Sequence, residues 1–245
     1  MPNGTPPKST IDSMALILEA ASEEDFLKRV VSAAGQCGFE MVSMGLKWQD
    51  SHGETHFRVA SNYPEAWQLL YFSRAYMAKD PVVRHCLSST EPLFWSEALF
   101  AEADAMDILE GAQAFGLGHG ISVPTHDGLG LISALNLARK DTIDLAAHGT
   151  ERLLRCAKVI ASCAHIAFRT LCMPDIQKEM ERPLSQQVRS CLRCVAMGMT
   201  SSEVATSLGV SDSTVIFHIK NAIDKLGTKS RAHAIAVAFR MGLLI

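Results

Sequence analysis

The sequence predicts an α+β protein, in which an N-terminal α/β/α sandwich with an antiparallel sheet precedes a small all-α domain. Up to about residue 171, helical patterns flank four or five short strand-like segments. The segment MPDIQKEMERP is polar and is bounded by two prolines, as is typical of a linker. Four helical patterns follow it, enough for a complete small domain. We therefore expect domains at residues 1–173 and 184–245, joined by a linker at 174–183.

The first domain should begin with two helices and a hairpin. Residues 14–21 are apolar and predict a helix, and Ser22 followed by three acidic residues predicts a second helix that reaches about residue 36. Residues 39–48 alternate loosely as in a strand, and residues 55–60 are its expected hairpin partner.

The middle of the chain predicts further helices and two more strands. Tyr63-Pro64 should start a helix to about residue 75, because proline is tolerated in a first turn. Asp80-Pro81 is expected to break the chain, and residues 91–95 to form an apolar turn. We expect a helix at 103–115, strands at 120–124 and 130–138, and one long helix at 141–171.

The last domain predicts a helix-turn-helix. A first helix is expected at 184–197. Thr200 and Glu203 form a capping-box pattern, and Gly209 suits the end of that short helix. Ser211 should cap a longer helix with a buried apolar stripe and an opposite face that is polar and basic, and residues 231–244 should form a fourth helix. A short turn between two such helices is typical of DNA-binding helix-turn-helix motifs, although a plain helical hairpin has the same pattern.

Charge and composition favour a DNA-binding module on a larger acidic domain. The chain has a formal net charge of −3, yet the residues from Pro183 onward carry seven basic against three acidic side chains, or +4, which leaves −7 for the rest. No apolar run is as long as a membrane span, and the N-terminus lacks a signal-peptide pattern, so we expect a cytoplasmic protein. Seven cysteines suit a reducing compartment, and Cys191 and Cys194 are expected to be buried thiols rather than metal ligands.

A cluster of aromatic residues with one carboxylate is the main candidate binding site. Tyr63, Trp67 and Tyr71 recur every four residues, which places them on one helix face. With Asp80 and Trp95 they would give apolar walls and a few hydrogen-bonding groups, suited to a small amide or polar head group. A half-buried structural helix, with Asp80 as a capping residue before Pro81, is the alternative interpretation.

No pattern in the sequence indicates catalysis or a cofactor. The glycine-rich GLGHGISVP lacks the lysine and the spacing of a phosphate-binding loop, so turn glycines before a strand are expected there. Neither a nucleophile elbow nor a metal-binding HExxH is present. We expect a protein that is not an enzyme.

Two long stretches resemble one family. SNYPEAWQLLYFSRAYMAKDPVVRHC, LFW and GLGHGISVP in the first half, and GMTSSEVATSLGVSDSTVIFHIKNAIDKLGTKSR with the closing GLLI in the second, are similar to LuxR-type quorum-sensing transcriptional regulators. The resemblance implies an N-acyl-homoserine lactone ligand and no cofactor. It also implies a homodimer that binds double-stranded DNA at an inverted-repeat operator.

The resemblance assigns roles in the ligand site. Trp67 would donate its indole N–H to the lactone carbonyl, Tyr63 would donate to the amide carbonyl, and Asp80 would accept the amide N–H. Other residues would line the pocket: Tyr71 and Trp95 as apolar walls, Asn136 where relatives often have a small hydroxyl, and Val83 and Ser43 by their position in matching segments.

The resemblance also makes the helix after Ser211 the recognition helix, with seven candidate DNA-binding residues: Thr214, Lys220, Asn221, His218, Lys225, Lys229 and Arg231. Val188, Met199 and Ile216 are among the positions that depart from the family, because they stand where relatives carry charged residues. These departures leave open an orphan or ligand-independent member that acts by heterodimerisation with other regulators.

Overall fold

The computed structural model of the chain describes residues 14–49, 54–128, 130–142, 149–179, 184–240 and 243–244, with side chains at 173–179 and 240 excepted. The chain divides into two compact units, one built mainly from residues up to Cys172 and the other mainly from Met173 onward.

The first unit contains a five-stranded antiparallel sheet in the order β2-β1-β5-β4-β3. Its central pair, β4 and β5, is in register from His119 opposite Arg139 to His126 opposite Ile132. The short edge strand β3 continues this pairing, with Leu93 opposite Ser122. The strands are β1 (Met41–Gln49), β2 (Thr55–Ser61), β3 (Leu93–Phe94), β4 (His119–His126) and β5 (Ile132–Arg139).

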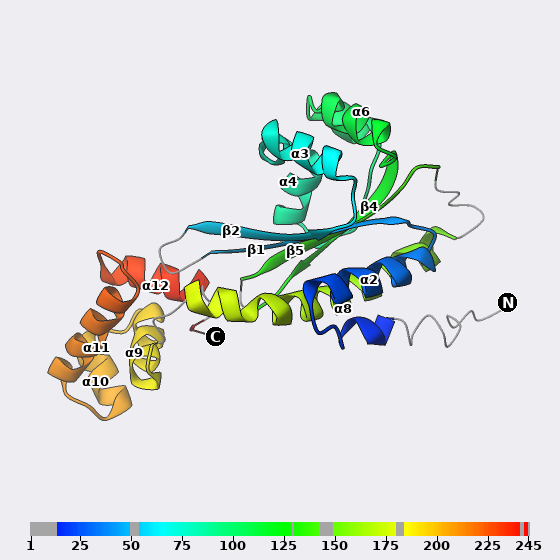
Figure 1. Cartoon of the computed structure of the whole chain (residues 1–245). Coiled ribbons are helices and arrows are strands. Elements are labelled where there is room, and N and C mark those ends of the chain that lie inside the picture. Colours follow the sequence, from blue (N-terminus) through cyan, green and yellow to red (C-terminus); the bar gives the residue numbers. More distant parts are fainter. Residues whose placement is uncertain are drawn as a thin grey trace. The chain divides into compact units, whose positions relative to one another are not determined.

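Helices cover both faces of this sheet, which confirms the predicted α/β/α sandwich (Figure 1). On one face lie α2 (Glu23–Gly35) and α8 (Thr150–Glu179), whose Phe26 and Phe168 rings stack with centroids 5.0 Å apart. On the other face lie α3 (Glu65–Ser73), α4 (Pro81–Ser88) and α6 (Met106–Ala114). Between these helices the chain also forms a 3-10 turn η1 (Tyr76–Ala78) and the short α5 (Glu97–Glu102).

Successive side chains of the middle strands point alternately to the two faces of the sheet. On β5, Ser133 lies on the α8 face, because its Oγ hydrogen-bonds Nδ1 of the α8 residue His165 at 2.8 Å. Leu135 and Leu137 share that face and are fully buried. Ala134 and Asn136 alternate with them and are only half-buried, so they lie on the face covered by α3, α4 and α6.

Asp80-Pro81 lies where the chain passes from η1 to α4, a helix that the sequence analysis missed. Asp80 is the N-cap of α4: its Oδ1 accepts a hydrogen bond from the backbone N–H of Val82 at 2.8 Å, and Pro81 occupies the first turn. Proline fits there because a first-turn N–H has no partner within the helix. The predicted apolar turn at 91–95 contains β3, and the helix predicted at 103–115 begins only at Met106, after Asp104 with a φ of +51°.

The long helix also differs from the prediction at both ends. Asp141 and Thr142 are not helical, residues 143–148 lie outside the described part, and α8 begins at Thr150. At the other end, α8 continues to Glu179 through most of the predicted linker, whose last residues, 180–183, are not described. The domain boundaries therefore stay predictions. Among the described helices, none is long and apolar enough to cross a membrane.

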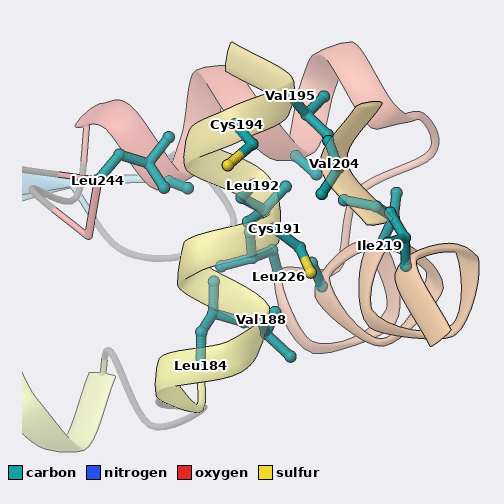
Figure 2. Close-up of a cluster of buried hydrophobic side chains, with 14 of the residues drawn as sticks. Leu184, Val188, Cys191, Leu192, Cys194, Val195, Val204, Ile219, Leu226 and Leu244 are labelled. Carbon is teal, nitrogen blue, oxygen red and sulfur yellow. The ribbon is translucent and has the colours of Figure 1, made fainter. Parts of the chain in front are cut away.

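The second unit is the predicted four-helix domain: α9 (Gln186–Ala196), α10 (Ser201–Leu208), α11 (Asp212–Lys225) and α12 (Arg231–Arg240). Both bonds of the Thr200–Glu203 capping box are present, and Gly209 ends α10 with a φ of +66°. Figure 2 shows side chains of these helices meeting in one apolar core, with Cys191 and Cys194 inside it as buried free thiols. The predicted fourth helix is shorter than expected, because α12 ends at Arg240.

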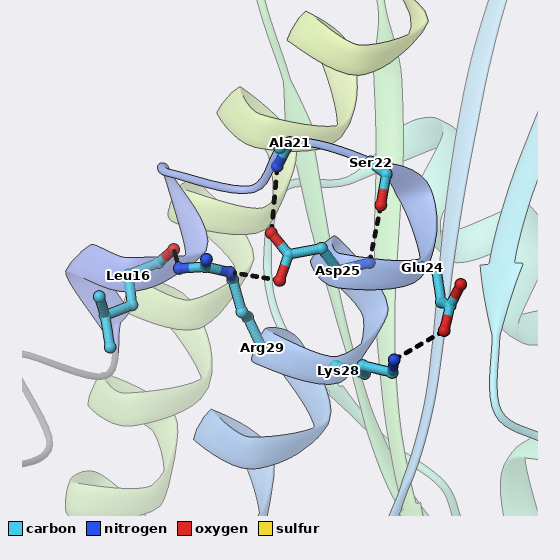
Figure 3. Close-up of polar contacts among 7 residues, drawn as sticks. All are labelled: Leu16, Ala21, Ser22, Glu24, Asp25, Lys28 and Arg29. Atoms are coloured by element: carbon cyan, nitrogen blue, oxygen red, sulfur yellow. Dashed lines mark hydrogen bonds and ion pairs between the residues drawn. The ribbon is translucent and has the colours of Figure 1, made fainter.

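The predicted start of α2 is confirmed in detail (Figure 3). Ser22 Oγ accepts from the backbone N–H of Asp25 at 3.1 Å, and the Asp25 carboxylate accepts from Ala21 N and from Arg29 Nε. Arg29 also donates to the carbonyl oxygen of Leu16 at 2.8 Å. One carboxylate and one guanidinium thus link the first described residues to α2.

Candidate functional site

The predicted aromatic face forms one cluster on the α3–α6 side of the sheet. The Trp67 ring centroid lies 5.8 Å from that of Tyr71 and 6.2 Å from that of Tyr76, and the two tyrosine centroids are 5.8 Å apart. Tyr63 and Trp95 pack against the same cluster. Trp67 and Tyr71 thus share one face of α3 as predicted, whereas Tyr63 lies before the helix begins at Glu65. The buried Tyr76 is a member that the sequence analysis missed.

Two glycines make room for the tryptophans. A Cβ atom on Gly111 would lie 2.8 Å from Cζ3 of Trp67, and a Cβ on Gly120 would lie 2.7 Å from Cε3 of Trp95. Each indole therefore lies directly against a backbone without a side chain. Gly120 lies in β4, within the strand predicted at residues 120–124, and Gly116 and Gly118 precede that strand.

Asp80 is a buried carboxylate held by the cluster. Tyr71 Oη donates to Asp80 Oδ2 at 2.7 Å, and Val82 N donates to Oδ1 at 2.8 Å. Burial raises the pKa of Asp80, while these two hydrogen bonds oppose the rise. Tyr71 is thus more than the apolar wall that the sequence predicted, because its hydroxyl positions the carboxylate.

The Tyr63 hydroxyl is fully buried and has no hydrogen-bond partner among the described residues. Burial and the nearby Asp80 charge raise the pKa of Tyr63, so the group stays protonated and able to donate. A buried donor without an acceptor costs about 1–3 kcal/mol. Trp67, whose indole N–H is a donor, is buried in the same cluster.

A chain of hydrogen bonds crosses the sheet beside the cluster. Trp95 Nε1 donates to Ser122 Oγ at 2.8 Å, and Ser122 Oγ donates to Asn136 Oδ1 at 2.6 Å. Asn136 Nδ2 then donates to the carbonyl oxygen of Ser43 at 3.3 Å. The structure thus brings together three predicted residues through Ser122, which sequence reasoning missed. Its position opposite Asn136 depends on the β4–β5 register, which no local pattern gives.

The side chain of the predicted ligand-site residue Val83 is not part of the cluster, although its backbone contributes a hydrogen bond to Asp80. It is half-buried, whereas its neighbour Val82 is buried and packs into the cluster. Along a helix, neighbouring residues point in different directions.

The candidate DNA-binding residues differ in exposure. Lys220 and Lys229 are exposed, whereas Thr214, Asn221, His218 and Lys225 are half-buried. Thr214 Oγ1 is 2.8 Å from Ser211 Oγ at the start of α11, and His218 Nδ1 is buried without a partner in the described residues. Arg231 Nη2 donates to the carbonyl oxygen of Met199 at 2.9 Å, so this side chain links α12 to the residue before α10.

Two of the three unusual residues lie in or against the core. Val188 is fully buried in the apolar core of the second unit, and Met199 packs against it. Only Ile216 is exposed. Among the described residues, no group of three or more His, Cys, Asp or Glu side chains could hold a metal ion.

Two family descriptions match the chain. Residues 22–168 match "Autoinducer binding domain", and residues 182–238 match "Bacterial regulatory proteins, luxR family".

Curated relatives match over nearly their whole length. The transcriptional activator protein AnoR of Acinetobacter nosocomialis is 29% identical over 95% of this chain and 98% of its own. The HTH-type quorum sensing-dependent transcriptional regulator RpaR of Rhodopseudomonas palustris is 30% identical over 89% of this chain and 88% of its own.

Solved structures share the fold. Escherichia coli SdiA matches with a TM-score of 0.77 at 23% identity, covering 97% of this chain and 98% of SdiA. The N-acylhomoserine lactone dependent factor CepR2 of Burkholderia cenocepacia matches with a TM-score of 0.54 at 22% identity, over 66% of this chain and 95% of CepR2. The chain belongs to the LuxR-type family of quorum-sensing transcriptional regulators, which are not enzymes, and it joins an autoinducer-binding domain to a helix-turn-helix DNA-binding domain.

Proposed function

We propose that the chain binds an N-acyl-homoserine lactone in the cluster around Trp67 and, in response, binds promoter DNA as a homodimer. The observation that carries the ligand assignment is the buried Tyr63 hydroxyl, an unpaired donor beside the Asp80 carboxylate. A donor and an acceptor side by side match the carbonyl and the N–H of one amide.

The other polar group of such a ligand also has a counterpart. A lactone ring carries a second carbonyl, and the buried Trp67 of the same cluster has an indole N–H that could donate to it. Tyr71 holds Asp80 in place through its 2.7 Å hydrogen bond. The acyl chain would then lie among the apolar side chains of the same cluster, on the half-buried face of β5.

Binding would stabilise this side of the domain. A ligand that binds only the folded state adds RT ln(1 + [L]/Kd), or about 2.7 kcal/mol at a hundred times Kd. A ligand carbonyl would give the Tyr63 hydroxyl an acceptor. The free-energy cost of the buried, unpaired donor would then disappear in the complex, which contributes to the affinity. We infer that folding of the domain and ligand binding are coupled.

The second unit would bind an inverted-repeat operator through α11, in the cytoplasm. The cap of Ser211 and the apolar core hold this helix against α9 and α10, so that its outer face is free to enter a major groove. The net charge of +4 from Pro183 onward attracts the phosphate backbone.

Expression with a panel of N-acyl-homoserine lactones tests the ligand assignment, with soluble yield and retention of DNA as readouts. Octanoyl-glycerol, which is present in one SdiA structure, is a sharp comparator, because it has an acyl chain but no amide. At least one lactone should raise both readouts above the level with octanoyl-glycerol. Equal yield and DNA binding without any acyl compound would contradict lactone control.

A second function, that of an orphan regulator acting through heterodimers, is favoured by one observation. Ile216 exposes an apolar side chain on α11 where relatives carry charge, which lowers the expected affinity for phosphates. Under this function, the chain would bind DNA alone only weakly in the presence of every lactone, and would lower DNA binding by a co-expressed relative.

A further inference from the structure

The recognition helix has an outward face that is half apolar. Val215, Ile219 and Ala222 point into the core of the second unit. The opposite face, at spacings of three and four, is formed by four exposed residues: Ser213, Ile216, Phe217 and Lys220. Ile216 is 59% exposed and Phe217 is 63% exposed.

Neither apolar side chain packs in the core of the second unit. Ile216 and Phe217 do not belong to the core cluster, although α11 buries a complete stripe on its other side. The Phe217 ring makes one described ring contact, with His218 at 5.7 Å between centroids. Two adjacent large hydrophobic residues thus stand in solvent at the centre of the face that a recognition helix turns toward DNA.

The surrounding charge indicates what covers this face. Lys220 shares it, and the unit carries an excess of basic residues, so a polyanion is attracted whereas a second copy of the same surface is repelled. Within a major groove, the apolar group offered by the bases is the C5-methyl of thymine. Aliphatic and phenyl side chains are suited to contact it.

We propose that Ile216 and Phe217 contact thymine methyl groups and thereby select thymine at the operator positions beneath them. The inference rests on the proposed binding of DNA and adds how part of the sequence is recognised. Selectivity at these positions comes from apolar contact, while Lys220 contributes attraction that is independent of sequence. The half-buried Thr214 and Asn221 lie along one flank of this face, two helical turns apart.

Replacement of thymine by deoxyuridine tests the proposal, because uracil keeps every hydrogen-bonding group of thymine and lacks only the methyl. A duplex is first selected from a randomised pool by the full chain purified with its lactone, and each thymine is then replaced singly. We expect at least two positions in each half-site at which affinity falls about four-fold, the effect of burying one methyl group.

Alanine variants connect each position to a side chain. Ile216→Ala and Phe217→Ala should each remove the thymine–uracil difference at one set of positions and leave the others unchanged. Ser213→Ala, on the same exposed face, is the matched control and should keep every difference. Lys220→Ala should weaken binding to thymine and uracil duplexes equally.

The possible failures are distinguishable. Equal affinity for thymine and uracil duplexes at all positions overturns the inference but leaves the proposed DNA binding intact. Selection of no duplex overturns both. If Ile216→Ala and Phe217→Ala change the assembly state but leave the thymine–uracil differences unchanged, this face is a protein interface and the inference is wrong.

Discussion

The two faces of the sheet in the first unit differ in how their polar groups are satisfied. On the face of α2 and α8, Leu135, Leu137 and Phe168 are fully buried, and the buried Ser133 Oγ is joined to His165 Nδ1 at 2.8 Å. On the face of α3, α4 and α6, Asn136 is half-buried and the Tyr63 hydroxyl has no described partner. The buried polar pair of the first face is hydrogen-bonded within the protein, whereas the second face contains groups that a ligand would satisfy. Variants on the two faces should therefore respond differently to ligand.

The largest effect on stability is expected on the face of α2 and α8. Phe168→Ala removes a ring that stacks on Phe26 and should cost about 3–5 kcal/mol of unfolding free energy, because it leaves a cavity that cannot close. Denaturant unfolding with saturating lactone measures this cost. Val159→Ala, on the exposed side of the same helix, is the control and should change stability little. A cost below about 1 kcal/mol for Phe168→Ala would show that this face is not tightly packed.

Gly120→Ala should disturb the other face through Trp95. The added Cβ would lie 2.7 Å from the indole and 2.8 Å from the backbone oxygen of Leu137, and the backbone cannot easily move away. We expect a loss of about 1–3 kcal/mol, measured by thermal unfolding, together with a weaker lactone response. Gly35→Ala, near the end of α2 with open space around its Cβ, should be neutral or stabilising. Equal effects of the two substitutions would contradict the close contact.

Asp80→Asn should separate stability from ligand response. The response should fall about ten-fold or more, because the amide N–H of the ligand loses a charged acceptor. Burial raises the pKa of Asp80 in the folded state above its unfolded value, so the charged form opposes folding. The carboxyl therefore favours folding most when it is protonated, and this contribution is lost as the pH rises through the folded pKa.

The ligand-free Asp80→Asn variant should thus be more stable than the parent at neutral pH, and the difference should shrink as the pH falls through the raised pKa. Melting temperatures of both proteins across that range measure the difference. A variant that is less stable at neutral pH would show that the hydrogen bonds from Tyr71 and Val82 outweigh the cost of burial.

Tyr63→Phe and Tyr71→Phe make the smallest and most closely matched comparison. Tyr63→Phe removes a hydroxyl that has no described partner, so ligand-free stability should stay the same or rise by up to about 1 kcal/mol, while lactone affinity falls about five-fold. Tyr71→Phe removes the donor to Asp80 and should lower ligand-free stability by about 1 kcal/mol. Identical stability changes in the two variants would contradict the distinction between an unpaired and a paired hydroxyl.

Local signals predicted much of the molecule. Ser22 and the Thr200–Glu203 pair act within a few residues, and the α3 aromatics recur at helical spacing, so their positions could be read directly. The Asp-Pro pattern that starts α4 was interpreted as a break, with a capping aspartate before proline as the alternative, because an N-cap followed by a first-turn proline and a loop contain the same residues.

The rest depended on contacts between distant segments. Ser122 meets Asn136 only through the register of two strands, and Gly120 matters because Trp95 lies on it. On α11, the buried stripe was predicted correctly, yet the DNA-binding candidates were chosen by polarity rather than by direction. By direction, Ile216 belongs to the outer face together with Phe217.

The most direct test of the central claim compares two ligands that differ only at the amide. An N-acyl-homoserine lactone offers its N–H to Asp80, whereas the corresponding O-acyl ester offers only an oxygen atom. If Tyr63 and Asp80 bind the amide, the parent protein should bind the amide about ten-fold or more tightly than the ester in a titration, and Asp80→Asn should lose most of this preference. Equal affinity of the parent protein for the amide and the ester would contradict the account.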